Sequence, residues 1–248
     1  MFIGDSNSID LATNVVSSLQ FENDSEWAWR NYKTVIESYL ASPDVRHVCE
    51  IGGGRNPLFS PEELAAFDVE YTILDISQAE LDLAGPEYHK LCCSIEETDH
   101  QPEFDMMYSK MVIEHVSNTQ LAYENIRDKL NPRGVCLSFH PTLYALPFIV
   151  NLLLPERLSR KVLGLIFPSR MNEESKFPAR YSWCFASRKI VRRLKVLGFR
   201  DALIVPFYGH TYYKNIPVLR SLENWWHGVA RRADLKASAS YAYTIVRR

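Results

Sequence analysis

Three features are scarce in this sequence, and each absence narrows what the protein can be. The chain has five cysteines in 248 residues, two of them adjacent (Cys92 and Cys93), which does not fit a disulfide framework. No apolar run reaches the roughly 18–20 residues that a membrane-spanning helix needs. The formal net charge is only −2, which argues against a surface built for a polyanion. We therefore expect a cytoplasmic protein without a signal peptide, for which nucleic acid is a disfavoured partner.

A glycine turn at residues 52–54 organises the rest of the chain. It follows an apolar strand predicted at residues 47–51, which carries the acidic residue Glu50. Glycine permits positive φ and lets the backbone approach a ligand closely. A strand, a glycine turn and a helix together form a nucleotide-binding βα unit. Alone the turn is a weak indication, because glycine turns are also common in ordinary loops.

An acidic residue at the end of the next predicted strand strengthens this interpretation. The strand is predicted at residues 69–76, with Asp75 at its carboxyl end. An acid about 20–25 positions after the glycine turn is placed to bind the two hydroxyls of a ribose. The alternative is that Asp75 only caps the following helix, where Ser77 and Glu80 already form a capping box. The glycine turn and the acid in register favour ribose binding.

Strands and helices alternate along most of the chain, which predicts an α/β fold with a parallel sheet and helices on both faces. A single domain is expected over residues 1–248, because no linker divides the chain. Residues 1–44 are predicted to form an N-terminal helical cap, with the first 24 residues loosely ordered and a helix at residues 25–41. The region around Trp225, Trp226 and His227 is predicted to be irregular. The further predicted strands cover residues 89–95, 104–109, 135–139, 201–207 and 241–247, and the further helices begin near residues 60, 78, 118 and 187.

Residues 141–183 interrupt this alternation and are predicted to form a helical insertion after the fifth strand. Residues 143–167 are strongly apolar, but prolines and charged residues punctuate them too often for a membrane span. A lid over a substrate pocket, a dimer surface and a peripheral membrane contact all fit this pattern. We favour the lid.

Four segments, in the right order, resemble the motifs of the class I S-adenosylmethionine-dependent methyltransferases. They are CEIGGG at residues 49–54, LDIS at 74–77, FDMMYSKMVIEHV at 104–116 and LNPRGVCLSF at 130–139. The resemblance runs from about residue 45 to the C-terminus. It implies a doubly wound, mostly parallel, seven-stranded Rossmann-like sheet with an antiparallel last strand. It also implies S-adenosylmethionine as the cofactor.

The resemblance further implies roles for individual residues. Glu50 would support the glycine turn, and Asp75 would accept hydrogen bonds from both ribose hydroxyls. The adenine would lie between Ile76 and Ile95, while Ser94 stands where a member often has an aspartate. The expected cofactor-binding residues are Glu50, Gly52, Gly53, Gly54, Asn56, Asp75, Ile76, Ser94, Ile95, Ser109, Met111 and His115.

Methyl transfer from a sulfonium requires the protein mainly to align the acceptor. A hydroxyl or amine acceptor also needs a general base. His140 is the first candidate, because it follows the fifth strand and ligands bind at the carboxyl ends of strands in such sheets. The alternative for His140 is a structural role. The residues expected to bind the acceptor are Tyr144, Arg180, Tyr181 and His210, and no metal site is predicted.

The function predicted from the sequence is therefore methyl transfer from S-adenosylmethionine to a small-molecule acceptor that is free or linked to a lipid or saccharide. Oxygen is the expected acceptor atom, and the apolar insertion is expected to cover the acceptor. Two alternatives are a catalytically silent partner subunit that only binds S-adenosylmethionine and, less favoured, an RNA methyltransferase. The latter would be expected to show a basic groove or an appended binding domain, and the sequence indicates neither.

Overall fold

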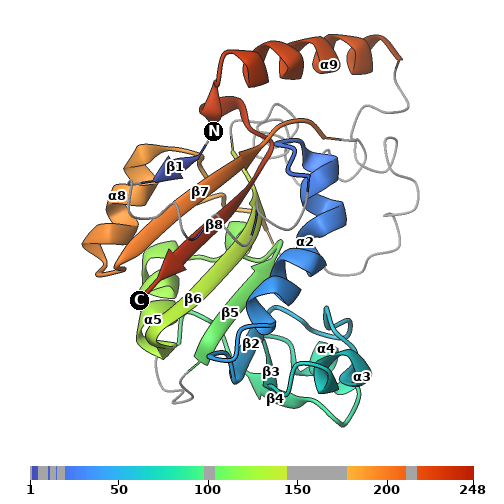
Figure 1. Cartoon of the computed structure of the whole chain (residues 1–248), viewed down its shortest axis with the longest axis vertical. Helices are drawn as coiled ribbons and strands as arrows, with labels where there is room; N and C mark the ends of the chain where they lie inside the picture. The colour runs from blue at the N-terminus through green and yellow to red at the C-terminus, as the bar shows by residue number, and fades with distance from the viewer. Residues whose placement is uncertain are drawn as a thin grey trace.

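The computed structural model describes residues 2–4, 11, 15, 20–97, 104–143, 178–210 and 217–248. At their centre is an eight-stranded sheet with the order β1-β7-β8-β6-β5-β2-β3-β4 (Figure 1). The strands are β1 (Ile3–Gly4), β2 (His47–Ile51), β3 (Glu70–Asp75), β4 (His89–Cys92), β5 (Phe104–Lys110), β6 (Leu130–Pro141), β7 (Asp201–Phe207) and β8 (Tyr241–Arg247). The helices are α2 (Ser25–Leu40), α3 (Pro61–Ala65), α4 (Gln78–Leu83), α5 (Thr119–Lys129), α8 (Arg188–Val196) and α9 (Pro217–Arg232), with 3₁₀ turns η2 (Ile113–His115) and η4 (Lys236–Ser238).

The pairing of the strands confirms the predicted Rossmann-like architecture. β2 pairs in parallel with β3 and β5, β3 with β4, and β5 with β6. The last strand, β8, is antiparallel to both of its neighbours, β6 and β7. The carboxyl ends of the parallel strands therefore lie at one edge of the sheet, where ligands bind in folds of this kind.

Helices cover both faces of the sheet, as side-chain alternation along β6 and β8 demonstrates. Phe139 and Tyr243 contact the ring of Tyr32 on α2. Their sequence neighbours Ser138 and Thr244 bond instead to the hydroxyl of Tyr123 on α5. Successive side chains of a strand point to opposite faces, so α2 and α5 lie on opposite sides (Figure 1). The sheet is thus doubly wound, as the sequence predicts.

The N-terminal helix begins where its cap predicts. The side chain of Asp24 accepts a hydrogen bond from the backbone N–H of Trp27 at 2.8 Å, a typical N-cap. Trp27 and Tyr32 are buried against the sheet, which agrees with a packing role for these aromatics. Trp29 is 40% exposed, and the Lys110 ammonium lies 4.9 Å from the centre of its ring.

Two predictions about the ends of the chain are wrong. Residues 3–4 form an eighth strand, antiparallel to β7 with Ile3 opposite Ile204, whereas this region was expected to be loosely ordered. Two residues are too few for an alternating pattern to reveal. The stretch containing Trp225, Trp226 and His227 is the helix α9, not an irregular segment. Proline is tolerated at the first position of a helix, so Pro217 marks its start rather than a break.

The turn before β6 is part of the strand. β6 begins at Leu130, five residues earlier than predicted, and its register with β5 shifts between Phe104 and Met106. Arg133 has a φ of 74°, so the Asn-Pro-Arg-Gly sequence forms an irregularity inside the ladder. At its other end β6 extends to Pro141, two residues further than predicted.

All five cysteines are free thiols. Among the residues that the structure describes, no helix combines the length and apolar character required to cross a bilayer. Residues 144–177, which hold most of the predicted lid and Tyr144, lie outside the described residues.

Candidate active site

The glycine turn lies at the carboxyl end of β2, and its neighbours leave no space for side chains. Gly52 has a φ of 75°, and its N–H donates to the carbonyl oxygen of Leu74 at 2.6 Å. A Cβ on Gly52 would lie 2.4 Å from Cγ2 of Val112, and one on Gly53 would lie 2.9 Å from Cγ2 of Ile73. Both contacts are too short for a side chain. Glycine is therefore required at both positions, which lie at the carboxyl edge of the sheet where ligands bind in folds of this kind.

Glu50 fixes this turn from behind. Its Oε2 accepts hydrogen bonds from the backbone N–H of Leu58, at 3.0 Å, and from the Tyr71 hydroxyl. The Tyr71 hydroxyl also bonds to that of Tyr108. Burial raises the pKa of the Glu50 carboxyl despite these bonds. Glu50 therefore ties the segment that follows the glycines to β3 and β5.

Asp75 faces the glycine turn from the end of β3. Its Oδ1 accepts from the N–H of Ser77 at 2.9 Å, and a Cβ on Gly54 would lie 3.2 Å from its Oδ2. Partial burial raises the pKa of the carboxyl, although the bonds from backbone N–H groups oppose that shift. Asp75 thus satisfies the backbone next to it and also presents a second oxygen toward Gly54. The two sequence interpretations of this residue are compatible.

The residues expected around the adenine have different surroundings. Ile76, beside Asp75, is 60% exposed, which is high for a large apolar side chain. Ile95 is buried, and its carbonyl accepts from Nδ2 of Asn125 at 2.9 Å. Ser94 uses its hydroxyl to accept from the N–H of Glu96 at 3.1 Å. Ile76 is therefore the apolar surface available to a flat ring at this point.

The end of β5 brings Ser109 and Met111 to the same edge. Ser109 is fully buried, and its hydroxyl has no hydrogen-bond partner among the described residues. Its carbonyl accepts from the Tyr32 hydroxyl at 3.0 Å. Met111 has a φ of 58°, and its N–H donates to Phe139 at 2.8 Å. Positive φ at a residue other than glycine is strained and concentrates at functional sites. Asn56, the remaining residue expected at the turn, is exposed, and its N–H donates to Gly53 at 3.2 Å.

Glu114, in the turn η2 after β5, is a candidate that sequence reasoning missed. Its side chain is buried, and Oε2 has no hydrogen-bond partner in the described part of the chain. Burial raises the pKa of its carboxyl to about 8. The EHV sequence was the available signal, but only the structure reveals the burial. A carboxyl that is so poorly solvated marks a functional-site candidate.

His140 lies inside the sheet rather than at its edge. Because β6 extends to Pro141, His140 pairs with Ala242 of β8. The residue is 1% exposed, its Nε2 lies 2.9 Å from Oγ1 of Thr244, and its Nδ1 lies 3.0 Å from the carbonyl oxygen of Pro141. Burial lowers the pKa of the imidazole to about 4. With both nitrogens engaged, this geometry speaks against the predicted role of His140 as the general base.

The residues expected to bind the acceptor separate into two places. Arg180 and Tyr181 donate their backbone N–H groups to the carbonyl oxygen of Glu114, at 2.7 and 3.0 Å. His115, which is expected to bind the cofactor, also lies beside Glu114, with 3.8 Å between its Nε2 and Oε1 of Glu114. His210 instead lies beside Glu223 of α9, with 2.6 Å between Nε2 and Oε1.

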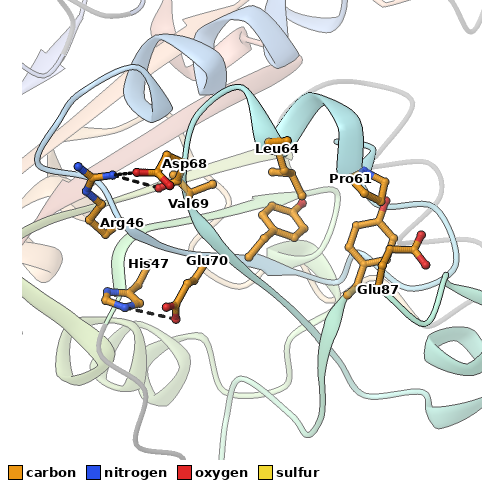
Figure 2. A pocket seen from close by; sticks show the side chains of 11 residues that line it. Arg46, His47, Pro61, Leu64, Asp68, Val69, Glu70 and Glu87 are labelled. Atoms are coloured by element: carbon orange, nitrogen blue, oxygen red, sulfur yellow. Dashed lines mark hydrogen bonds and ion pairs between the residues drawn. The ribbon is translucent and has the colours of Figure 1, made fainter.

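A separate cavity of about 660 Å³ lies at the opposite edge of the sheet. Its lining includes Arg46, His47 and Glu70 from the amino ends of β2 and β3 (Figure 2). Arg46 is paired with Asp68, and His47 lies 3.4 Å from Glu70. These charged groups are already engaged with one another. The cavity is therefore separate from the expected cofactor site, because that site lies at the carboxyl ends of the same strands.

Residues 50–138 match the family model described as a methyltransferase domain. This range contains the glycine turn, Asp75 and Glu114. No curated protein sequence matches the chain.

The fold is similar to that of several solved structures. Phosphoethanolamine N-methyltransferase 2 of Haemonchus contortus, in complex with S-adenosyl-L-methionine, is 14% identical with a TM-score of 0.56, and the match covers 88% of this chain and 52% of that one. A methyltransferase dependent on S-adenosylmethionine from Archaeoglobus fulgidus is 14% identical with a TM-score of 0.52, covering 91% and 100%. The N-methyltransferase NodS of Bradyrhizobium japonicum WM9, in complex with S-adenosyl-L-homocysteine, is 13% identical with a TM-score of 0.50, covering 98% and 99%. This chain thus spans about half the length of the first structure.

The sheet order and the matched domain define a Rossmann-like fold with a methyltransferase domain, in which the glycine turn faces Asp75. The chain carries a methyltransferase domain at residues 50–138, and its fold is that of solved methyltransferases dependent on S-adenosylmethionine. The residues present fit that cofactor. The glycine backbone, the Asp75 carboxyl and the exposed Ile76 would face its methionyl, ribose and adenine parts.

Proposed function

We propose that the protein methylates an oxygen atom of a small-molecule acceptor, free or linked to a lipid or saccharide, with Glu114 as the general base. The observation that carries this proposal is the buried carboxyl of Glu114, whose Oε2 has no partner in the described part of the chain. It follows the strand end that carries Ser109, at the cofactor edge.

The raised pKa of Glu114 suits such a base. A catalytic base works best when its pKa lies near the operating pH, and burial brings that of Glu114 to about 8. S-adenosylmethionine supplies a methyl group on a positively charged sulfur. The acceptor oxygen forms a bond to the methyl carbon, the sulfur–methyl bond breaks, and its electron pair stays on sulfur. The proton of the acceptor hydroxyl passes to the Glu114 carboxylate.

The position of residues 178–183 supports an acceptor site next to Glu114. Arg180 and Tyr181 hold the carbonyl of Glu114 through their backbone. The two ends of the region predicted as a lid also meet, because the N–H of Leu143 donates to the carbonyl oxygen of Cys184 at 2.9 Å. We propose that residues 141–183 cover the acceptor and that Tyr144, Arg180 and Tyr181 contact it.

Nitrogen is the second candidate for the acceptor atom. Two structures of similar fold are N-methyltransferases by name. An ammonium group would pair directly with a Glu114 carboxylate and could give up its proton to it. The same base therefore serves both acceptors, and an acceptor screen must include both classes.

The test begins with binding of S-adenosylmethionine, measured by calorimetry on the native protein. A screen with methyl-labelled S-adenosylmethionine and paired hydroxyl and amine acceptors then identifies the acceptor class. Glu114→Gln should lower turnover by about 10²–10⁴-fold and leave the affinity for S-adenosylmethionine unchanged. Turnover of Glu114→Gln equal to that of the native protein would refute the base. Binding without turnover on any acceptor would favour the silent partner subunit.

A further inference from the structure

A second cluster of titratable side chains lies where the end of β7 meets α9. His210 follows β7 by three residues, while Glu223 and His227 lie four residues apart on α9. Oε1 of Glu223 is 2.6 Å from Nε2 of His210 and 3.1 Å from Nε2 of His227. Residues four apart lie on the same face of a helix. Two distant segments thus aim three polar side chains at one point.

The burial of the cluster indicates a built site rather than a chance surface contact. The exposed fractions of the side chains are 2% for His210, 9% for Glu223 and 13% for His227. A carboxylate so far from water is costly unless it is compensated. The two histidines compensate the Glu223 carboxylate, since their Nε2 atoms lie 2.6 and 3.1 Å from its Oε1.

The geometry is close to that of a metal site. One ligand atom from each of the three residues lies within 4.8 Å of the others. Tetrahedral zinc with bonds of about 2.0–2.1 Å places neighbouring ligand atoms roughly 3.3 Å apart. The two distances from Glu223 to the histidines, 2.6 and 3.1 Å, are slightly shorter than this spacing. Two imidazoles and one carboxylate are donors that zinc accepts, whereas magnesium and calcium prefer oxygen ligands alone.

We propose that His210, Glu223 and His227 bind one zinc ion, which fastens α9 to the end of β7. Three protein ligands leave the fourth position of a tetrahedral ion for water or another donor. The site does not share a residue with the cofactor cradle. It also reassigns His210, which the sequence had suggested as an acceptor-binding residue. The proposal stands whether or not Glu114 is the base.

The experiment uses the whole chain after treatment with a chelator, at a pH where free imidazoles are neutral. Calorimetric titration with Zn²⁺ should detect one equivalent, and Co²⁺ in its place should give the intense visible absorption of a tetrahedral ion. Glu223→Gln and His227→Ala should each weaken Zn²⁺ binding by 100-fold or more.

His47→Ala is the matched control. His47 also lies near two carboxylates, at 3.4 and 3.7 Å, but it is half exposed and has no second histidine beside it among the described residues. Its loss should leave Zn²⁺ binding intact.

Thermal unfolding provides a second measurement. With Zn²⁺ at about 100 times its Kd, the Tm of the native protein should rise by roughly 5–10 °C. Glu223→Gln keeps nearly the volume of the native side chain and should not show this rise. Circular dichroism and binding of S-adenosylmethionine establish that each variant is folded. Absence of stoichiometric Zn²⁺ binding to the native protein would overturn the proposal, as would native affinity in a folded Glu223→Gln, and the trio would then be an ion pair alone.

Discussion

Gly52 lies directly beneath Val112, so that a Cβ on the glycine would be 2.4 Å from Cγ2 of the valine. This contact joins the glycine turn after β2 to the segment after β5. That segment continues two residues later into Glu114. Through this contact the glycine turn packs against the segment that carries the candidate base. A change at Gly52 should be felt in both.

Gly52→Ala should therefore weaken the affinity for S-adenosylmethionine at least tenfold, about 1.4 kcal/mol. The substitution imposes a side chain at positive φ and pushes Val112 away. It should also lower the free energy of unfolding by about 1–3 kcal/mol. Calorimetry and urea unfolding measure the two effects. The control is Gly228→Ala in α9, where nothing lies within 4 Å of the new Cβ. It should stabilise the helix by about 0.5–1 kcal/mol and leave cofactor affinity unchanged.

Asp75→Ala should weaken binding of S-adenosylmethionine about tenfold, or 1.4 kcal/mol. We expect the carboxyl oxygen that faces Gly54 to accept from the ribose hydroxyls. Asp82→Ala removes a carboxylate of the next helix, whose Oδ1 accepts from Gln78 at 2.7 Å. That control should bind the cofactor normally. Equal affinities for native protein and Asp75→Ala, measured by calorimetry, would exclude Asp75 from the ribose site.

The sequence was sufficient for seven of the eight strands of the sheet and for the glycine turn, but not for the candidate base. β2, β7 and β8 have the predicted bounds because each is a short apolar run between clear breaks. The glycine turn and Asp75 are local features, so their placement follows from the strand ends. The role of His140 depends instead on where β6 ends. Two additional residues of strand place His140 opposite Ala242 of β8, inside the sheet.

The burial of Glu114 and the proposed zinc site could not be predicted from the sequence for a different reason. The burial of Glu114 depends on η2 and on residues 178–181, which are about 65 positions away along the chain. The pairing of His210 with Glu223 requires β7 and α9 to meet. Such distant contacts leave no periodicity in the sequence. The predicted irregularity at residues 225–227 also concealed the i, i+4 spacing of Glu223 and His227.

The buried imidazole of His140 should make the protein less stable in acid. Its pKa is about 4 in the folded protein, below the ordinary 6.5. The unfolded chain therefore binds this proton at higher pH than the folded chain does. The stability that results is present above pH 6.5 and is lost as the pH falls toward 4, by about 3 kcal/mol in total. Urea unfolding across this range should show a flatter profile for His140→Gln. His47→Gln, at a half-exposed site, should keep the native slope.

Glu114 should make the free energy of unfolding depend on pH in the opposite direction, and over a higher pH range. Its pKa is about 8 in the folded protein against an ordinary 4.5, so the folded chain holds the proton that the unfolded chain has released. The free energy of unfolding should therefore fall as the pH rises from 4.5 to 8, by roughly 3–5 kcal/mol. Glu114→Gln should remove this decline, whereas Glu87→Gln, an exposed control, should retain it. Turnover should increase over the same upper range, because only the ionised carboxylate can accept the proton of the acceptor. If the free energy of unfolding changed with pH in the same way for native protein and Glu114→Gln, the raised pKa of Glu114 would be contradicted. A turnover rate independent of pH would contradict the role of Glu114 as the base.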